Sequence, residues 1–406
     1  MPQEQKGSAV VIVGGTRYDR MLSLNLKRSR EESTCSGTIV LSWPGAEHFN
    51  TNVLQAAALM SGADGVILLD DQLAATIVID ARLSKATPKQ YELTLQFRGK
   101  ASAIVDSTPQ HDTGQENNKS PVQIMQSLLK GSGVGLQDMS GGGAAKQIKR
   151  FIVASGETTE RAMRRAGREH SLTFNENERG MIEVHGQNGT EGMGSGVTLI
   201  AGRDFTQWQT KLDLSPRADE IEAMGNAIPT DENYGENAEN VSAQNNYDIS
   251  ESGNRTMRHH VDGDHDNQSM QGRNDLEGAR RAGQAMNVQL RMSTWSDEGG
   301  ALWAVNRTYT VIIPIDNVNG PLVCSEVEFE LSPDTRAATL VLQGDGVVGG
   351  AGDVLFDKKT NQPIAPEDPN PQPPGPDDTL SVEERQRQYR ENLRRRRQER
   401  PIPGPG

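Results

Sequence analysis

The sequence predicts a mainly β protein with two antiparallel β regions, a small α+β unit and an extended C-terminal tail. Short segments of apolar or alternating side chains, separated by Gly, Pro and Asp, occupy the first part of the chain and return near its end. A helical pattern over Thr158–His170 marks the α+β unit between them. Ten of the 20 prolines fall within Pro363–Pro405, which indicates extended backbone in the tail.

Composition limits the classes of function. The chain has 406 residues and a net charge of −13, so its surface should repel DNA. Its apolar runs are shorter than the roughly 18 residues that a membrane-spanning helix needs, and we expect no membrane partner. The N-terminus lacks the charged-then-apolar order of a secretory signal, which argues against export by that route. Two cysteines, Cys35 and Cys324, are too few for a disulfide framework or a zinc site, and we expect buried, inert thiols.

The first β region is predicted to span residues 1–106. Its clearest strand is Met21–Arg28, where Leu22, Leu24 and Leu26 alternate with polar residues. The other strands are predicted at Ser8–Val13, Gly37–Trp43, Val66–Leu69, Ala75–Leu83 and Tyr91–Gly99. Short strands of this kind favour a small antiparallel barrel or sandwich.

The middle of the chain divides into two predicted parts. Residues 107–147 are interpreted as a linker with one short helix, which starts at Ser120-Pro121 and stops near Gly131. Residues 148–190 are predicted to form the α+β unit: a strand, the helix already named and a hairpin around Asn175–Gly180.

The second β region is predicted at 191–228 and 276–342, interrupted by an insert at 229–275. The insert carries ten acidic residues, three arginines and almost no apolar residues, so it is interpreted as a loop. A helix is predicted at Leu276–Met286. Strands are predicted at Val197–Ala201, Phe205–Leu214, Val288–Trp295, Tyr309–Ile313, Val323–Leu331 and Ala338–Leu342.

No segment of the sequence carries a convincing catalytic, cofactor or metal site. The run His259–Asp266 contains imidazoles and carboxylates, but its spacing matches neither a helical zinc motif nor a calcium loop. The glycine-rich segments Gly131–Gly135 and Gly192–Gly196 lack the Lys-Ser/Thr of a phosphate loop and are interpreted as turns. Asp70-Asp71 has no assignable partner acid for glycoside cleavage. We therefore predict a protein that is not an enzyme and needs no cofactor.

Residues 343–406 are predicted to be a Gly/Pro-rich linker followed by an Arg-rich helix. Ser381 and Glu384 form a capping box that starts this helix. The region from Tyr389 to Arg400 holds six arginines and two glutamates, opposite in sign to the whole chain. The helix is predicted to dock on an acidic neighbouring protein, the alternative being a disordered solubilising tail. The predicted docking residues are Val382, Tyr389, Leu393, Arg394, Arg395, Arg396 and Arg397.

The ordered set of segments resembles the Mu-type baseplate hub proteins of contractile-tailed bacteriophages, which are T-even hub-like and have barrels related to the tail tube. The resemblance covers about residues 8–215 and 276–342. The segments that carry it are Gly14–Tyr18, Arg28–Glu31, Ser36–Leu41, Glu157–Val184, Glu277–Ala285, Gly300–Asn306, Val323–Phe329 and Ala338–Leu342.

The resemblance implies two tail-tube-like barrels per chain and a homotrimer at the tail tip. Such a trimer would adapt the hexameric tail tube to the trimeric central spike and form part of the DNA ejection channel. The implied partners are the tail tube protein, the central spike protein, and wedge or other baseplate proteins, with a tape measure protein as a further neighbour. DNA would pass through the lumen without specific binding. The protein would be assembled in the host cytoplasm and reside in the virion baseplate.

The alternative from another class is a tail-associated hydrolase, cell-wall or metal-dependent, that uses the His259–Asp266 loop. If the hub hypothesis holds, the acidic excess predicts a negatively charged channel wall. The insert at 229–275 would then lie on the outer surface or at a subunit contact.

Overall fold

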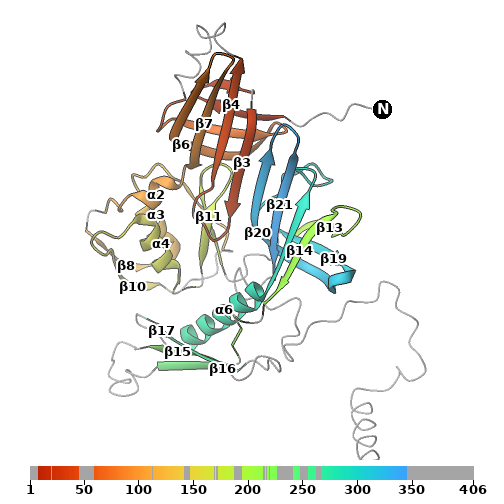
Figure 1. The fold of residues 1–406 in the computed structure, drawn as a ribbon. Helices are drawn as coiled ribbons and strands as arrows, with labels where there is room; N and C mark the ends of the chain where they lie inside the picture. The colour runs from red at the N-terminus through yellow and green to blue at the C-terminus, as the bar shows by residue number, and fades with distance from the viewer. Residues whose placement is uncertain are drawn as a thin grey trace, which may run out of the picture. The chain divides into compact units, whose positions relative to one another are not determined.

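Strands from both ends of the described chain hydrogen-bond into a 13-stranded sheet (Figure 1). This computed structural model describes residues 8–344, apart from 20, 45–58, 112, 141–146, 169, 171, 187–193, 214, 216, 219, 226–240, 247–254 and 262–266. The mainly β class predicted from the sequence is confirmed. None of the described helices is long and apolar enough to cross a membrane.

The first section of this sheet comes from the N-terminal part of the chain. The alternation predicted from the sequence is present in β3 (Met21–Ser29), since Leu24 and Leu26 are buried and Asn25 and Lys27 are partly exposed. The order is β3-β4-β7-β6-β5-β1-β2. The strands are β1 (Ala9–Val13), β2 (Thr16–Tyr18), β3 (Met21–Ser29), β4 (Ser36–Pro44), β5 (Asp64–Leu69), β6 (Gln72–Thr87) and β7 (Gln90–Gly99).

The second section lies after the α+β unit and has the order β14-β18-β21-β20, with β19 on β20 and β13 on β19. A short 3-10 helix, η2 (Pro314–Asp316), follows β19. The strands are β13 (Gly194–Ile200), β14 (Gln207–Leu212), β18 (Met286–Met292), β19 (Thr308–Ile313), β20 (Val318–Leu331) and β21 (Arg336–Gln343).

The two sections are one continuous sheet because β20 pairs with β3 on one edge and with β21 on the other. The antiparallel register runs from Glu326 opposite Ser29 to Leu331 opposite Leu24. Buried apolar side chains of both sections, from Val11 to Leu342, belong to a single hydrophobic cluster. The alternating patterns could not predict that β20 pairs with β3. The pattern of a strand shows which of its faces is buried and not which strand lies beside it.

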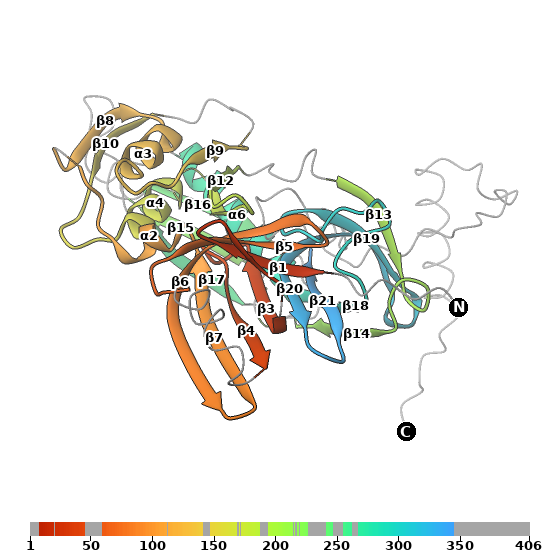
Figure 2. The same cartoon turned by 90° about the horizontal axis from the view of Figure 1, so that it is seen from above.

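A separate hydrophobic cluster holds the small α+β unit, whose orange to yellow elements group together in Figure 2. Ile124 and Met125 of α3 pack in this core with Ala162 and Met163 of α4. The elements are α2 (Ser102–Asp106), β8 (Gln115–Lys119), α3 (Pro121–Leu128), β9 (Leu136–Asp138), β10 (Ile148–Ile152), α4 (Thr159–Arg168), β11 (Thr173–Glu176) and β12 (Ile182–His185).

The structure differs here from the interpretation of 107–147 as a linker. β8 pairs antiparallel with β10, and Leu128 of α3 is buried in the core of the unit. The sequence did not predict β8 because its residues, QENNK, are all polar and only Glu116 is buried. Its place is secured by backbone hydrogen bonds, which leave no apolar signature. The predicted Ser120 cap and Pro121 start of α3 are confirmed, with Gln123 completing a capping box.

The insert 229–275 is also more structured than predicted. β16 (Val241–Asn246) and β17 (Thr256–Val261) flank β15 (Glu220–Gly225) in a three-stranded sheet. Helix α6 (Asn267–Ala285) begins inside the insert, before the predicted start, and contacts β15, β16 and β18. Met270 is buried on α6, and Asn274 Nδ2 donates to the Ile221 carbonyl at 3.1 Å. The prediction of a loop was wrong because this polar segment is ordered by its pairing with β15 and by its contact with α6.

Candidate functional site

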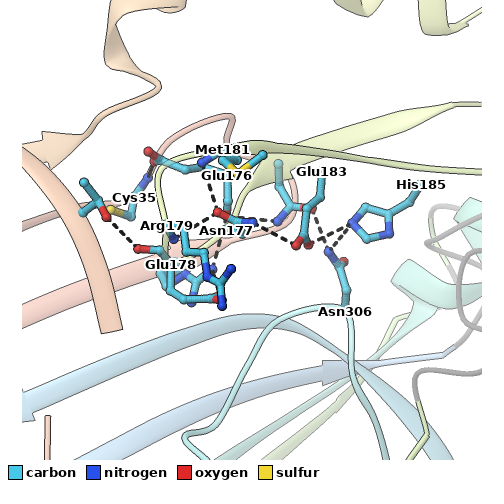
Figure 3. A network of polar contacts seen from close by, with 12 residues as sticks. Cys35, Glu176, Asn177, Glu178, Arg179, Met181, Glu183, His185 and Asn306 are labelled. Atoms are coloured by element: carbon cyan, nitrogen blue, oxygen red, sulfur yellow. Dashed lines mark hydrogen bonds and ion pairs between the residues drawn. The ribbon is translucent and has the colours of Figure 1, made fainter. Parts of the chain in front are cut away.

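A buried carboxylate fastens the β11–β12 hairpin of the α+β unit to the first β section (Figure 3). Glu176 ends β11 and is only 5% exposed. Its carboxylate accepts hydrogen bonds from the backbone N–H groups of Ala101 at 2.8 Å and Cys35 at 3.0 Å, and from Thr34 Oγ1 at 3.0 Å. Hydrogen bonds of this number offset the cost of burying a carboxylate.

The room for this carboxylate comes from Gly99, the last residue of β7. A Cβ at this position would overlap both carboxylate oxygens of Glu176. Arg28 adds a further tie, since its Nη2 donates to the Glu176 carbonyl at 3.2 Å. Burial raises the pKa of the Glu176 carboxyl above its ordinary value, although the hydrogen bonds and Arg28 act in the opposite direction.

At the other end of the hairpin, an amide and an imidazole fasten it to the second β section. Asn306 Nδ2 donates to Asn175 Oδ1 at 2.7 Å and lies 3.1 Å from His185 Nε2 (Figure 3). Because an amide nitrogen can only donate, Nε2 accepts and the His185 proton sits on Nδ1. The Asn306 backbone N–H donates to the Cys324 carbonyl at 2.9 Å, and its φ of 64° suits asparagine. The hairpin therefore bridges both β sections.

The contacts of Glu176, Asn175, His185 and Asn306 form a junction between the hairpin and the two β sections. His185 is held neutral at this junction. The side chain is 1% exposed, and burial lowers its pKa to about 4, with the positive charge of Arg30 acting in the same direction. Glu183 Oε2 lies 3.7 Å from Nε2, too far for a hydrogen bond. The arrangement stabilises the neutral imidazole and opposes its protonation.

An ion pair beside a buried tryptophan also joins the two β sections. Trp295 is fully buried, and its Nε1 lies 3.2 Å from the Glu330 carbonyl and 3.1 Å from the Ala337 carbonyl. The Arg336 guanidinium lies 4.3 Å from the centre of the Trp295 ring and pairs with Asp70. Asp70 and Asp71 have positive φ values in the turn between β5 and β6, so this acidic pair is a turn with a structural ion pair.

None of the residues that form this junction was predicted from the sequence as a candidate site. His259 and His260 lie on β17, and residues 262–266 fall outside the described part. Within the described ranges, no group of three His, Cys, Asp or Glu side chains could hold a metal. Cys35 and Cys324 are buried, as predicted, and burial raises the pKa of both thiols, that of Cys324 to about 12. The docking residues Val382 to Arg397 also lie outside the described residues.

Sequence reasoning missed Glu176, His185 and Asn306, although one signal was present. In the strand around Phe174, the period-two pattern places Glu176 on the same face as Phe174, which is buried in the core of the α+β unit. A carboxylate on a core face needs a specific set of donors. The donors themselves, Ala101 and Cys35, are far away in the sequence and could not be named.

The fold of this chain matches solved structures of phage tail proteins. The 43 kDa tail protein of prophage MuSo2 from Shewanella oneidensis aligns with a TM-score of 0.70 and 16% identity, over 83% of this chain and 98% of that protein. A tail protein from Neisseria meningitidis MC58 aligns with a TM-score of 0.69 and 16% identity, over 85% and 98%. This chain has the fold of phage tail proteins. The resemblance seen in the sequence is thereby confirmed at the level of fold.

A similar fold occurs in a component of a secretion system. The E. coli c3393 protein, a component of the type VI secretion system similar to the T4 tail proteins gp27 and gp5, aligns with a TM-score of 0.50 and 8% identity, over 88% of this chain and 79% of that one. No protein-family model matches the sequence, and no curated protein matches it. The likeness is therefore one of three-dimensional structure.

The junction should make the stability of the protein depend on pH. Unfolded His185 binds a proton below about pH 6.5 but the folded residue only below about 4, so acidification from 6.5 to 4 favours the unfolded state. A pKa shift of this size corresponds to about 3 kcal/mol of unfolding free energy. Glu176 acts oppositely: its raised pKa stabilises the fold below its ordinary value of 4.5, and this contribution disappears as pH rises through the folded pKa.

We expect His185→Gln to flatten the acid limb of the stability profile, because a glutamine oxygen can still accept from Asn306 but does not titrate. Denaturant unfolding of both proteins at pH 6.5 and 4.5 measures the difference. Equal losses of unfolding free energy in the wild type and the variant would contradict the assignment to His185.

Proposed function

We propose that this protein is a structural baseplate hub of a contractile phage tail. Three chains would form a ring that adapts the hexameric tail tube to the trimeric central spike. The observation that carries this proposal is the division of the described sheet. The first section contributes β1, β3, β4, β5, β6 and β7, besides the short β2, and the second contributes β13, β14, β18, β19, β20 and β21. A chain with one section of seven strands and another of six lets a three-fold ring offer six similar surfaces.

The contacts that join the sections support an adaptor role. The β3–β20 pairing, the Glu176 carboxylate and the Arg336–Asp70 ion pair each tie segments that lie far apart in the sequence. An adaptor acts through shape and symmetry and requires no reaction centre. The described residues offer no observation that favours the hydrolase alternative.

The edge strand β14 is our candidate for the contact between subunits. Among the described strands it pairs only with β18, so its other edge is open for a neighbour. Leu212 on β14 is 60% exposed, and Ile315 on η2 is 82% exposed. Asp316 holds η2 against β14 through hydrogen bonds from Trp208 Nε1 at 2.9 Å and Thr210 Oγ1 at 2.8 Å. An open edge with exposed apolar residues is typical of an interface.

We expect native mass spectrometry to find a trimer of the full 44.2 kDa chain, and Leu212→Glu with Ile315→Glu to weaken it at least tenfold, because two buried charges would cost roughly 2 kcal/mol or more. Ile152→Glu provides a matched control, since Ile152 is 49% exposed on β10 of the α+β unit. A monomeric wild type at micromolar concentration would refute the hub. A trimer that resists the double substitution would refute only the β14 contact.

As a hub, the protein would have several partners within the virion. The tail tube, central spike, wedge proteins and a tape measure protein are the neighbours that a hub would contact, in a virion baseplate assembled in the host cytoplasm. DNA would pass the ring without specific binding, along a wall of net negative charge. The C-terminal segment with Val382, Tyr389, Leu393 and Arg394–Arg397 is proposed to dock on an acidic baseplate protein.

A further inference from the structure

The α+β unit carries an open groove of about 840 Å³ that the hub proposal leaves without a role. Its walls come from β8, from α3 and the turn that follows it, and from β9. Leu129, Val134 and Leu136 supply apolar surface. The remaining lining is mostly amide and amine.

The polar lining is rich in hydrogen-bond donors and carries positive charge. Lys119 and Lys130 line the groove together with several Asn and Gln side chains, and none of its lining residues is acidic. Glu116 lies buried behind Lys119 and is compensated by Lys119 Nζ at 2.6 Å and by Ser127 and His111. Lys130 is exposed and forms no ion pair within the described part of the chain. A positive groove on a chain of net charge −13 selects for negative ligands.

The capping box of α3 determines which group of the Gln123 side chain can bind a ligand. Gln123 Oε1 accepts from the Ser120 backbone N–H at 3.0 Å as part of the capping box. The carbonyl oxygen of this side chain is therefore occupied, and its NH₂ group is what remains for a ligand. Donors of this kind suit the carbonyl oxygens of a peptide and the carboxylates of its side chains.

Strand order favours an extended ligand. β8 is the end strand of the sheet β10-β8, and β9 is the end strand of the sheet β11-β12-β9. Residues of both end strands, Asn117 and Leu136 among them, line the same groove. In the described structure each strand therefore has one edge free for a further strand, which is how sheets capture extended peptides.

We propose that this groove binds an extended acidic segment of another protein, with β8 or β9 as the template and Lys130 as the charge partner. The proposal rests on the hub function only for the source of that segment, a neighbour in the assembly. Peptide binding can be measured on the isolated full-length protein. Its failure would therefore leave the trimer test untouched.

The probe is a fluorescein-labelled peptide of alternating Glu and Val, compared with the same peptide carrying Lys in place of Glu. Fluorescence anisotropy should show saturable binding of the acidic peptide only, and weaker binding at higher salt. Lys130→Glu should weaken it about tenfold, the change expected when an exposed attraction becomes a repulsion. Lys85→Glu is the matched control, because Lys85 is an exposed lysine on β6, outside the groove.

A second variant separates loss of binding from loss of fold. Gln126→Ala removes an exposed groove amide without touching the core, and it should reduce affinity at an unchanged melting temperature. Three outcomes would overturn the proposal: no binding of the acidic peptide, equal binding of the basic peptide, or equal losses in Lys130→Glu and Lys85→Glu. Tighter binding of a single-stranded oligonucleotide, abolished by Lys130→Glu, would also overturn it and assign the groove to nucleic acid.

Discussion

Trp295→Ala should destabilise the protein by about 4 kcal/mol, the largest effect that we expect from a single side chain, since loss of a buried Trp typically costs 3–5 kcal/mol. The indole is fully buried, and its removal would leave a cavity in the core shared by both β sections. It would also leave the Glu330 and Ala337 carbonyls without the indole N–H, and Arg336 without the ring on which it lies. Denaturant unfolding followed by circular dichroism measures the change.

Trp208→Ala is the control for this experiment. Trp208 lies on the edge strand β14, is partly exposed, and donates one hydrogen bond to Asp316. Its loss should cost clearly less than that of Trp295, about 1–2 kcal/mol. If the two variants lost equal stability, the assignment of Trp295 as the side chain that contributes most to the shared core would be wrong. Asp70→Asn reports separately on the Arg336 ion pair, with an expected cost of about 1 kcal/mol or less.

Gly99→Ala should have the second largest effect, about 3 kcal/mol, although it adds a single methyl group. The new Cβ would overlap the Glu176 carboxylate and force it away from the backbone N–H groups of Ala101 and Cys35. A displaced carboxylate in a buried site loses hydrogen bonds and keeps its desolvation cost. We expect a lower melting temperature and faster proteolysis of the β11–β12 hairpin, whose attachment to the first section depends on that carboxylate.

A double-mutant cycle identifies the cause. If the overlap with Glu176 accounts for the loss, Gly99→Ala should cost little in a Glu176→Ala background. Gly135→Ala is the matched control, because a Cβ there would meet only the flexible end of Met181 at 3.1 Å. Additive losses in the cycle would show that Gly99 serves some need other than space for Glu176.

These two variants test the mechanical basis of the hub proposal. An adaptor must hold its binding surfaces in fixed relative positions. Weaker contacts between its sections should therefore reduce assembly at a smaller loss of stability than is needed to unfold either section. A Gly99→Ala protein that still folds should therefore form less trimer at a given concentration. Normal assembly in a protein with a mobile hairpin would argue that the ring does not depend on this joint.

Local sequence determined those elements that carry their own physical signal. The alternation of Leu24 and Leu26 located β3, the Ser120-Pro121 pair located the start of α3, and Asn175–Gly180 located the β11–β12 turn. In each case the residues that create the signal lie within a few positions of the element they define. The order of such elements along the chain was enough to suggest the tail-protein fold.

Tertiary structure decided the features that join distant residues. β8 and β16 have polar sequences and are strands only because β10 and β15 lie beside them. Glu176 is a tolerable buried charge only because Gly99 leaves it room and Ala101 and Cys35 donate to it. The pairing of β20 with β3, which makes one sheet of two sections, depends on backbone groups that every residue possesses. Backbone N–H and C=O groups are the same at almost every residue, so the sequence does not show which strand edges pair. Only the folded structure shows it.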